Sequence, residues 1–150
     1  MSRGKEMSIM QAITVAALTW KRHHQKNMLP YGITLKQSYV LHQLEEQEAL
    51  CPSEIADMIF CDRPTATVVI KNMEKQGWVK RNRDAADFRR IQITLEPAGR
   101  AKLEEIAQNQ ASPQSESFDP LSCFTRTEKE QFSNLLIRLN KHLEHLTTSP

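Results

Sequence analysis

The chain has 150 residues, of which 39% are hydrophobic and 25% are charged, and its formal net charge is +2 at pH 7. This length predicts one buried core, so we expect a single domain with helical extensions. The sequence has neither a membrane-spanning apolar run nor the pattern of a secretory leader, so we expect a cytoplasmic protein with no membrane partner.

The residue types that usually hold metals or perform catalysis are present but scattered. Cys51, Cys61 and Cys123 form no C-x-x-C pair, which argues against a zinc site or a disulfide framework. Of the five histidines, only His142 and His145 share a helix face, and no third ligand accompanies them. With no nucleophile–base pair, phosphate-binding glycine loop or paired carboxylate, we expect no enzyme activity, metal or cofactor.

The first half of the chain predicts two helices. Residues 7 to about 27 carry one apolar stripe and contain neither Gly nor Pro. Thr34 and Gln37 form a capping-box pattern that opens a second helix, whose buried face includes Leu41 and Leu44. Residues 45–50 are expected to be a solvated connector.

Two short helices follow, and the second has one polar face. Pro52 opens a helix with an apolar inner side, and Asp62 is a strong N-cap for the next helix, which Gly77 ends. Its apolar stripe consists of Ala66, Val69, Ile70 and Met73. Its opposite face consists of Arg63, Thr65, Thr67, Val68 and Lys71. Cations and short hydroxyls suit phosphates and base edges in a major groove, whereas Val68 fits either a thymine methyl or the edge of the core.

A basic hairpin follows Gly77. Residues 78–81 and 91–95 alternate as paired strands, and the polar segment 82–90 is too long for a tight turn, so it is expected to project as a wing. Its cations are Lys80, Arg81, Arg83, Arg89 and Arg90. Because residues 38–61 contain acidic side chains and no Lys or Arg, the molecule has an electrostatic polarity that would orient it on DNA.

The C-terminal third predicts two more helices. Pro97 opens a helix through Leu103 and Ile106, and residues 108–119 form a polar loop. A second capping box, at Thr125 and Glu128, opens a last helix of roughly 20 residues with a leucine-rich face. The first and last helices are more apolar than a small winged core needs, so we expect them to pack together and against a second subunit.

These segments resemble the MarR (multiple-antibiotic-resistance regulator) family of winged helix-turn-helix transcription factors. The likeness covers about a third of the chain and is carried by residues 52–56 (PSEIA), 62–65 (DRPT), 73–81 (MEKQGWVKR), 87–89 (DFR) and 94–99 (TLEPAG). The chain departs from the family at Phe60, where the turn usually carries Gly, and at Cys51, where Ser or Thr is usual before Pro52.

The resemblance implies a mainly α fold with a small β-hairpin. It predicts dimerisation helices at 7–30 and 125–148, a winged helix-turn-helix lobe at 34–108 and a loop at 109–124. It also implies a homodimeric repressor on a pseudo-palindromic double-stranded operator, with Asp87 holding Arg89 for its contact. The expected DNA-contacting residues are Arg63, Pro64, Thr65, Thr67, Val68, Lys71, Arg81, Arg83, Asp87, Arg89 and Arg90.

Three hypotheses beyond simple repression stay open. The resemblance implies a small aromatic effector, for which the candidate residues are Trp20, His23, His24, Tyr31 and Tyr39. Cys51 precedes a helix N-terminus, where a thiol is able to sense oxidants, although Cys51 has no nearby resolving cysteine. The third hypothesis is a winged-helix interaction module or structural dimer without specific DNA binding.

Overall fold

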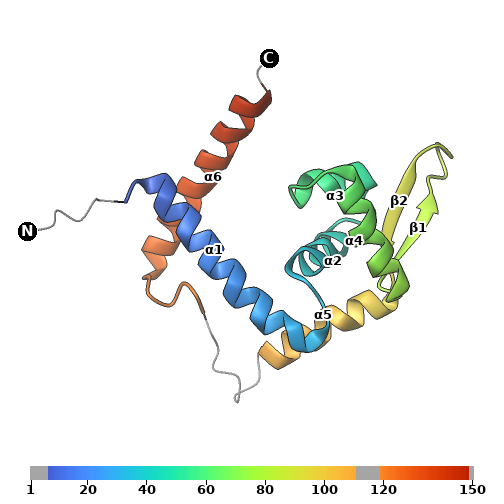
Figure 1. Cartoon of the computed structure of the whole chain (residues 1–150), viewed down its shortest axis with the longest axis horizontal. Helices are drawn as coiled ribbons and strands as arrows, with labels where there is room; N and C mark the ends of the chain where they lie inside the picture. Colours follow the sequence, from blue (N-terminus) through green and yellow to red (C-terminus); the bar gives the residue numbers. More distant parts are fainter. Residues whose placement is uncertain (1–6, 111–118, 149–150) are drawn as a thin grey trace, which may run out of the picture. The chain divides into compact units, whose positions relative to one another are not determined.

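The computed structural model describes residues 7–110 and 119–148, which are mainly helical with one two-stranded antiparallel sheet, as predicted. They fall into two compact units, within residues 1–115 and 116–150. The first unit contains α1 (Ile9–Met28), the short 3-10 helix η1 (Leu29–Tyr31), α2 (Leu35–Glu46), α3 (Pro52–Met58), α4 (Arg63–Lys75), β1 (Val79–Arg83), β2 (Ile91–Leu95) and α5 (Pro97–Gln110) (Figure 1). The second contains α6 (Arg126–Thr148).

Side-chain caps fix where several helices begin. The predicted capping box at α2 is present, with the Gln37 N–H donating to Thr34 Oγ1 at 3.2 Å. The predicted box before α6 is present too, because the Glu128 N–H donates to Thr125 Oγ1 at 3.3 Å. An unpredicted box at Ser8 and Gln11 starts α1 at residue 9 rather than 7.

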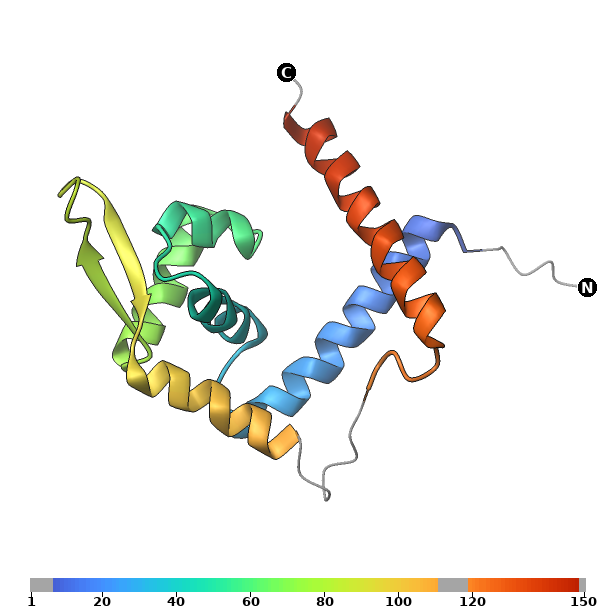
Figure 2. The same cartoon turned by 180° about the vertical axis from the view of Figure 1, so that it is seen from behind.

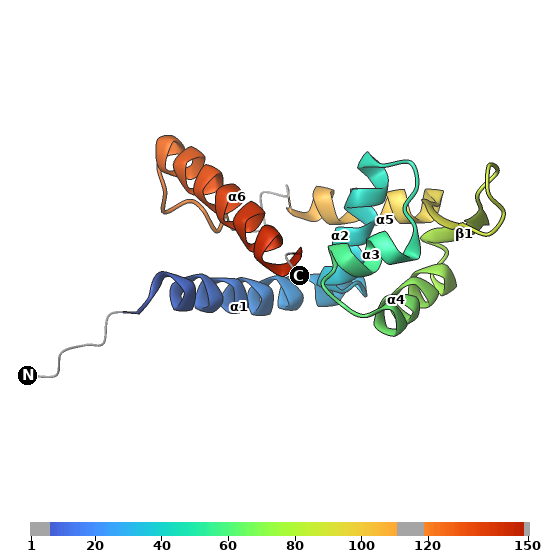
Figure 3. The ribbon, with the colours of Figure 1, turned by 90° about the horizontal axis from the view of Figure 1, so that it is seen from above.

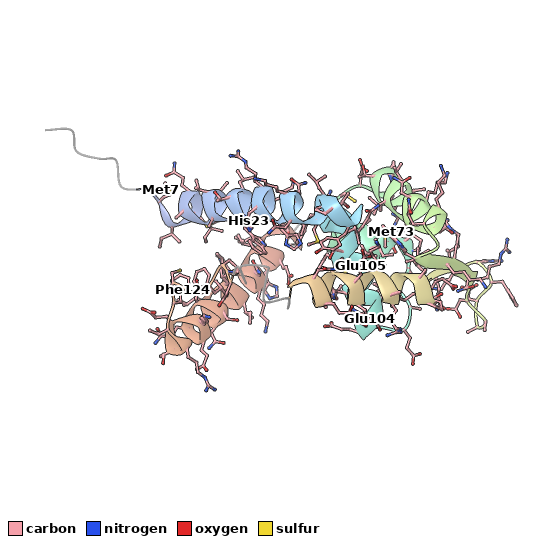
Figure 4. The ribbon with its side chains drawn as sticks, turned by 90° about the horizontal axis from the view of Figure 1, so that it is seen from below. Met7, His23, Met73, Glu104, Glu105 and Phe124 are labelled. Atoms are coloured by element: carbon pink, nitrogen blue, oxygen red, sulfur yellow. The ribbon has the colours of Figure 1, made fainter. Side chains whose placement is uncertain are left out.

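The core of the first unit lies where its short helices meet the sheet. Leu41 of α2, Ile55 of α3, Ile70 and Met73 of α4, and Ile93 of β2 are all 0 to 1% exposed. Figure 4 shows Met73 on the inner side of α4, toward the other helices. Burying such a side chain contributes roughly 1.5–3 kcal/mol, so the predicted apolar stripe of α4 anchors that helix.

The expected solvated connector at residues 45–50 is wrong at both ends. Helix α2 continues to Glu46, and Leu50 is only 6% exposed. Its backbone pairs with Ile93, with N–H···O distances of 3.1 and 2.8 Å in the two directions. Leu50 therefore adds a one-residue bridge at the middle of β2, a pairing between distant segments that local polarity does not reveal.

The base of the hairpin lies next to the start of α5 (Figure 2). Its strands pair from Val79 with Leu95 to Arg83 with Ile91, so β1 starts one residue later and ends two residues later than predicted. At its base, the Glu96 N–H donates to the Trp78 carbonyl at 2.9 Å. A Cβ on Gly99 would lie 2.3 Å from that carbonyl oxygen, so only glycine lets α5 approach the hairpin this closely.

The predicted loop at 109–124 is shorter than expected at its start, because α5 extends to Gln110. Residues 111–118 of that loop lie outside the described part of the chain. In the second unit, the rings of Phe124 and Phe132 stack with centroids 5.7 Å apart. Within the described residues, no helix has both the length and the apolar character of a membrane span.

Candidate DNA-binding surface

Helix α4 presents a polar face, and the first turn of the helix is capped by Asp62. Asp62 Oδ1 accepts from the Thr65 N–H at 2.8 Å, and hydrogen bonds from Thr65, its side chain first and its backbone second, lower the pKa of Asp62. The negative cap also suits the positive end of the helix. Arg63, Pro64 and Thr65 are exposed at the start of α4.

The remaining predicted residues of this face differ in how free they are. Lys71 is exposed, and Val68 is 57% exposed, which places Val68 on the solvent side rather than in the core. The Thr67 hydroxyl donates to the Arg63 carbonyl at 2.9 Å, and its side chain is half-buried. Thr67 therefore already uses its donor inside the helix and offers an acceptor and a methyl group outward.

Two aspartates shape the wing through its backbone. Asp87 Oδ1 accepts from the Arg89 N–H at 3.0 Å, and Asp84 Oδ1 accepts from the Ala86 N–H at 2.9 Å. The tip is closed by the Asp84 N–H, which donates to the Arg90 carbonyl at 2.9 Å. Asp87 thus contacts Arg89 through the main chain, because its carboxylate forms a turn with the backbone of Arg89.

Arg81 was expected to face DNA, yet it joins two elements of the lobe. Its Nε and Nη2 donate to the two carboxylate oxygens of Glu74, each at 3.4 Å. Glu74 lies on α4 and Arg81 on β1, so this two-point contact links the helix to the hairpin. The contact assigns Arg81 a positioning role beside its predicted contact role.

A cavity of about 350 Å³ connects the helix-turn-helix to the wing. It is lined by Cys51, Pro52, Ser53, Arg63, Thr67, Arg89, Arg90 and Ile91. Cations from α4 and from the hairpin thus face the same opening. Figure 3 shows α4 and the hairpin at the same end of the lobe.

Most of the cations on this surface have no internal partner. Among the described residues, none of the ion pairs involves Arg63, Lys71, Arg83 or Arg89. On the hairpin, Arg81 is paired with Glu74, and Arg90 Nη2 lies 3.8 Å from Cys51 Sγ. Unpaired guanidinium and ammonium groups on one surface attract a polyanion.

The predicted effector residues are only partly brought together. Trp20 lies against His23 and His24 on α1, with ring centroids 6.2 and 5.1 Å apart (Figure 4 labels His23). Tyr31 instead packs against the core of the lobe, and Tyr39 is 45% exposed on α2.

His24, on α1, has a pKa below its ordinary value. Burial lowers the pKa of His24 first, and the charges of His23 and His42 lower it further. His42 belongs to α2, so this effect ties the end of α1 to the next helix. No sequence pattern had singled out His42.

Sequence reasoning also missed Lys102, because its partners are distant along the chain. Its Nζ donates to the Tyr31 carbonyl at 3.2 Å and to Glu105 Oε2 at 2.6 Å, and it lies 5.9 Å from the Trp78 ring centroid. Lys102, on α5, thus contacts both η1 and Trp78. Within the described residues, no group of three His, Cys, Asp or Glu side chains is placed to hold a metal ion.

Comparison with known proteins finds one family whose model matches part of the chain. The model of the MarR family matches residues 33–91, which run from the start of α2 to the wing. The HTH-type transcriptional regulator TtmR of Methylorubrum extorquens is 35% identical over 89 residues, covering 59% of this chain and 46% of that protein. The chain thus spans about half the length of this curated relative.

Two solved structures share the fold over nearly the whole chain. A cysteine-to-serine mutant of Escherichia coli MarR, complexed with operator DNA, has a TM-score of 0.75 at 21% identity and covers 87% of this chain and 92% of that one. Bordetella bronchiseptica BpsR, whose DNA binding is regulated by 6-hydroxynicotinic acid, has a TM-score of 0.74 at 21% identity and covers 93% and 98%.

Proposed function

We propose that this chain, which belongs to the MarR family of winged helix-turn-helix proteins, is a homodimeric transcriptional repressor that binds a pseudo-palindromic DNA operator. The observation that carries the proposal is the cavity shared by Arg63 of α4 and by Arg89 and Arg90 of the wing. Guanidinium groups from two elements face one opening, which suits simultaneous contact with a groove and the adjacent backbone.

Each element has its own task in this mechanism. The exposed start of α4 enters the major groove, where Arg63 and Thr65 reach base edges and Lys71 reaches a phosphate. The turns formed by Asp84 and Asp87 hold the wing so that Arg83 and Arg89 meet the neighbouring backbone or minor groove. The Glu74–Arg81 contact keeps helix and hairpin at one angle, so both meet the same stretch of duplex.

The proposal of a homodimer rests on apolar side chains that neither terminal helix buries. In α1 only Met28 is buried, while Ile9 and Leu18 are 79% and 60% exposed. In α6, Leu135 and Leu146 are 59% and 62% exposed. Such rows of exposed apolar side chains on long helices favour burial against a second copy, which also supplies the second recognition helix of a palindromic site.

The same mechanism includes regulation by a small aromatic ligand. The rings of Trp20, His23 and His24 offer a stacking surface near the end of α1, and BpsR shows that a protein of this fold responds to an aromatic acid. A ligand there shifts the spacing of the two recognition helices only as far as its affinity differs between the two spacings.

A second candidate, thiol-based regulation, is favoured by one contact. Arg90 lies 3.8 Å from Cys51 Sγ, so oxidation of that sulfur would disturb a wing arginine directly. Peroxide should then release DNA from the wild type but not from Cys51→Ser. An equal response of the two proteins would eliminate Cys51 as the sensor.

Selection of bound fragments from genomic DNA, followed by salt titration, tests the main proposal. Arg63→Ala and Arg89→Ala should each weaken binding. Arg89→Ala should also lower the slope of log K against log salt by about 2 per dimer if both copies contact phosphate, whereas Arg63→Ala, which removes a base contact, should mainly relax sequence specificity. Arg100→Ala is the matched control, because Arg100 lies on α5 and pairs with Glu45 at 3.4 Å.

The possible outcomes separate the candidate functions. Weak binding that ignores Arg63→Ala and Arg89→Ala would favour a protein-interaction module over a repressor. Sedimentation of the purified protein tests the dimer, and a monomer at micromolar concentration would contradict it.

A further inference from the structure

The turn between α3 and α4 contains a side chain whose placement nothing within the fold explains. Phe60 is 95% exposed, and its backbone has a φ of 52°. Among the described residues it is the only non-glycine residue with a positive φ. A side chain is unfavourable in this left-handed conformation, and the ring of Phe60 obtains almost no burial to offset the strain.

The end of α4 shows what the end of α3 would normally contain. At α3, the Cys61 N–H donates to the Ala56 carbonyl at 3.0 Å and the Phe60 N–H to the Asp57 carbonyl at 3.2 Å. These two bonds form the helix-ending Schellman pattern, in which the residue at the position of Phe60 is usually glycine.

The two bonds that end α4 have the same spacing. The Trp78 N–H donates to the Met73 carbonyl at 3.0 Å and the Gly77 N–H to the Glu74 carbonyl at 2.9 Å. The left-handed residue of that turn is Gly77, with a φ of 71°. The chain therefore uses glycine for this geometry at one helix end and an exposed phenylalanine at the other.

The position of the turn indicates what the ring meets. Phe60 comes two residues before Asp62, the N-cap of α4, and three before the exposed Arg63. In a helix-turn-helix, the first helix crosses the DNA backbone and the N-terminal end of the second enters the major groove. The turn that joins them therefore lies at the rim of that groove, where the 5-methyl group of thymine is the principal apolar group on the base edges.

We propose that the Phe60 ring contacts the DNA at the rim of the major groove by packing against the 5-methyl group of a thymine. This contact rests on the proposed function and gives it a specificity-determining residue outside the helix and the wing. The strained backbone holds the ring outward, so the fold is less stable than it would be with glycine.

The test measures stability and operator affinity in the same variants. Phe60→Gly should raise the midpoint of thermal unfolding by about 2 to 4 °C, because glycine relieves the left-handed strain. The same variant should weaken binding to selected operator DNA about tenfold, the loss expected when an apolar base contact is removed from both half-sites. Opposite changes in stability and affinity are unexpected for a residue with only a structural role.

Two further variants separate the ring from the backbone. Phe60→Asn also tolerates a positive φ and removes the ring, so its affinity should fall as far as that of Phe60→Gly. Phe60→Leu keeps an apolar side chain and the strain, so it should retain wild-type stability and most of the affinity. If Phe60→Gly loses affinity while Phe60→Asn does not, the cause is a flexible turn and the contact is refuted.

Replacing single thymines of the operator with deoxyuridine identifies the partner atom. One such replacement in each half-site should weaken binding by the wild type and leave binding by Phe60→Gly unchanged. Equal effects on both proteins at every position would overturn the thymine contact. A gain in stability without any loss of DNA affinity would overturn it too and would indicate a protein partner for the ring.

The controls distinguish this inference from the proposed function. Arg63→Ala should weaken binding whether or not Phe60 contacts DNA. If the wild type selects no DNA, the proposed function fails and the contact fails with it. If the wild type and Phe60→Gly bind equally while Arg63→Ala does not, only the contact at Phe60 is wrong.

Discussion

The close approach of α5 to the hairpin makes Gly99→Ala a sharp test of the packing of the lobe. A Cβ at residue 99 would lie 2.3 Å from the Trp78 carbonyl oxygen and 2.7 Å from Leu95 Cδ1. The carbonyl belongs to the backbone and already accepts the Glu96 N–H at 2.9 Å, so it cannot turn aside as a flexible side chain would. Helix α5 must move away from the hairpin instead.

The size of the effect follows from three contributions. Forcing one extra methyl group into a packed site costs about 1–3 kcal/mol. Weakening the hydrogen bond from Glu96 to Trp78 costs about 0.5–1.5 kcal/mol, and the better helix propensity of alanine returns up to about 1 kcal/mol. The net loss should be about 2 kcal/mol in the free energy of unfolding, or roughly 4–8 °C in the unfolding midpoint.

Urea denaturation at a fixed protein concentration measures this loss, with Gly77→Ala as the matched control. A Cβ on Gly77 meets nothing within 4 Å, so its cost is only that of a side chain at a φ of 71°, about 1 kcal/mol. Because displacement of α5 moves the base of the wing, Gly99→Ala should also weaken operator binding. A Gly99→Ala protein as stable as the wild type, or more stable than Gly77→Ala, would refute the reasoning.

Three further outcomes follow from the structure. A double-mutant cycle with Glu74→Gln and Arg81→Ala should give a coupling in the free energy of unfolding below about 1 kcal/mol, because both side chains are about one-third exposed. A larger value would mean a stronger link between helix and wing. His24 has a lowered pKa, so protonation favours the unfolded chain, and the free energy of unfolding should fall as the pH falls from above 6.5 through the folded pKa. His24→Gln should flatten this pH dependence in urea titrations. An unchanged slope would contradict the prediction. Asp62 also has a lowered pKa, so its charge stabilises the fold above the unfolded pKa of 3.8, and this stabilisation is lost as the pH falls through the folded pKa. Asp62→Asn keeps a helix cap, so its stability should differ from that of the wild type at neutral pH and converge with it in acid. Circular dichroism during unfolding measures both stabilities.

The sequence predicts the helices well because their signals are local. Thr34 and Asp62 cap the helices that follow them, and Gly77 ends α4, as their residue types indicate. The buried faces of α3 and α4 follow from a helical period that any packing arrangement must respect. Local signals therefore identify the exposed face of α4 before its neighbours are known.

Contacts between distant segments account for the features that the sequence did not reveal. The pairing of Leu50 with Ile93 depends on where the hairpin folds back, and Lys102 meets a carbonyl 71 positions away in the chain. The contact between Glu74 and Arg81 was missed for the same reason, since a charge pattern does not tell which cation a nearby carboxylate will bind. The charge pattern of a sequence predicts where a basic surface lies more reliably than which of its basic side chains lack a carboxylate partner.

Stability and recognition are assigned to different residues on α4, and this separation makes the proposed function testable. Ala66 and Ile70 are 1% exposed, so changes there report on folding, whereas Arg63 and Lys71 are exposed and unpaired among the described ion pairs. Substitutions on the exposed side should change affinity with little change in unfolding. Phe60 is the exception, because its strained backbone lowers stability while its exposed ring is proposed to serve DNA recognition. A loss of affinity that accompanies a gain in stability at this position is therefore stronger support for a contact than any loss of affinity alone.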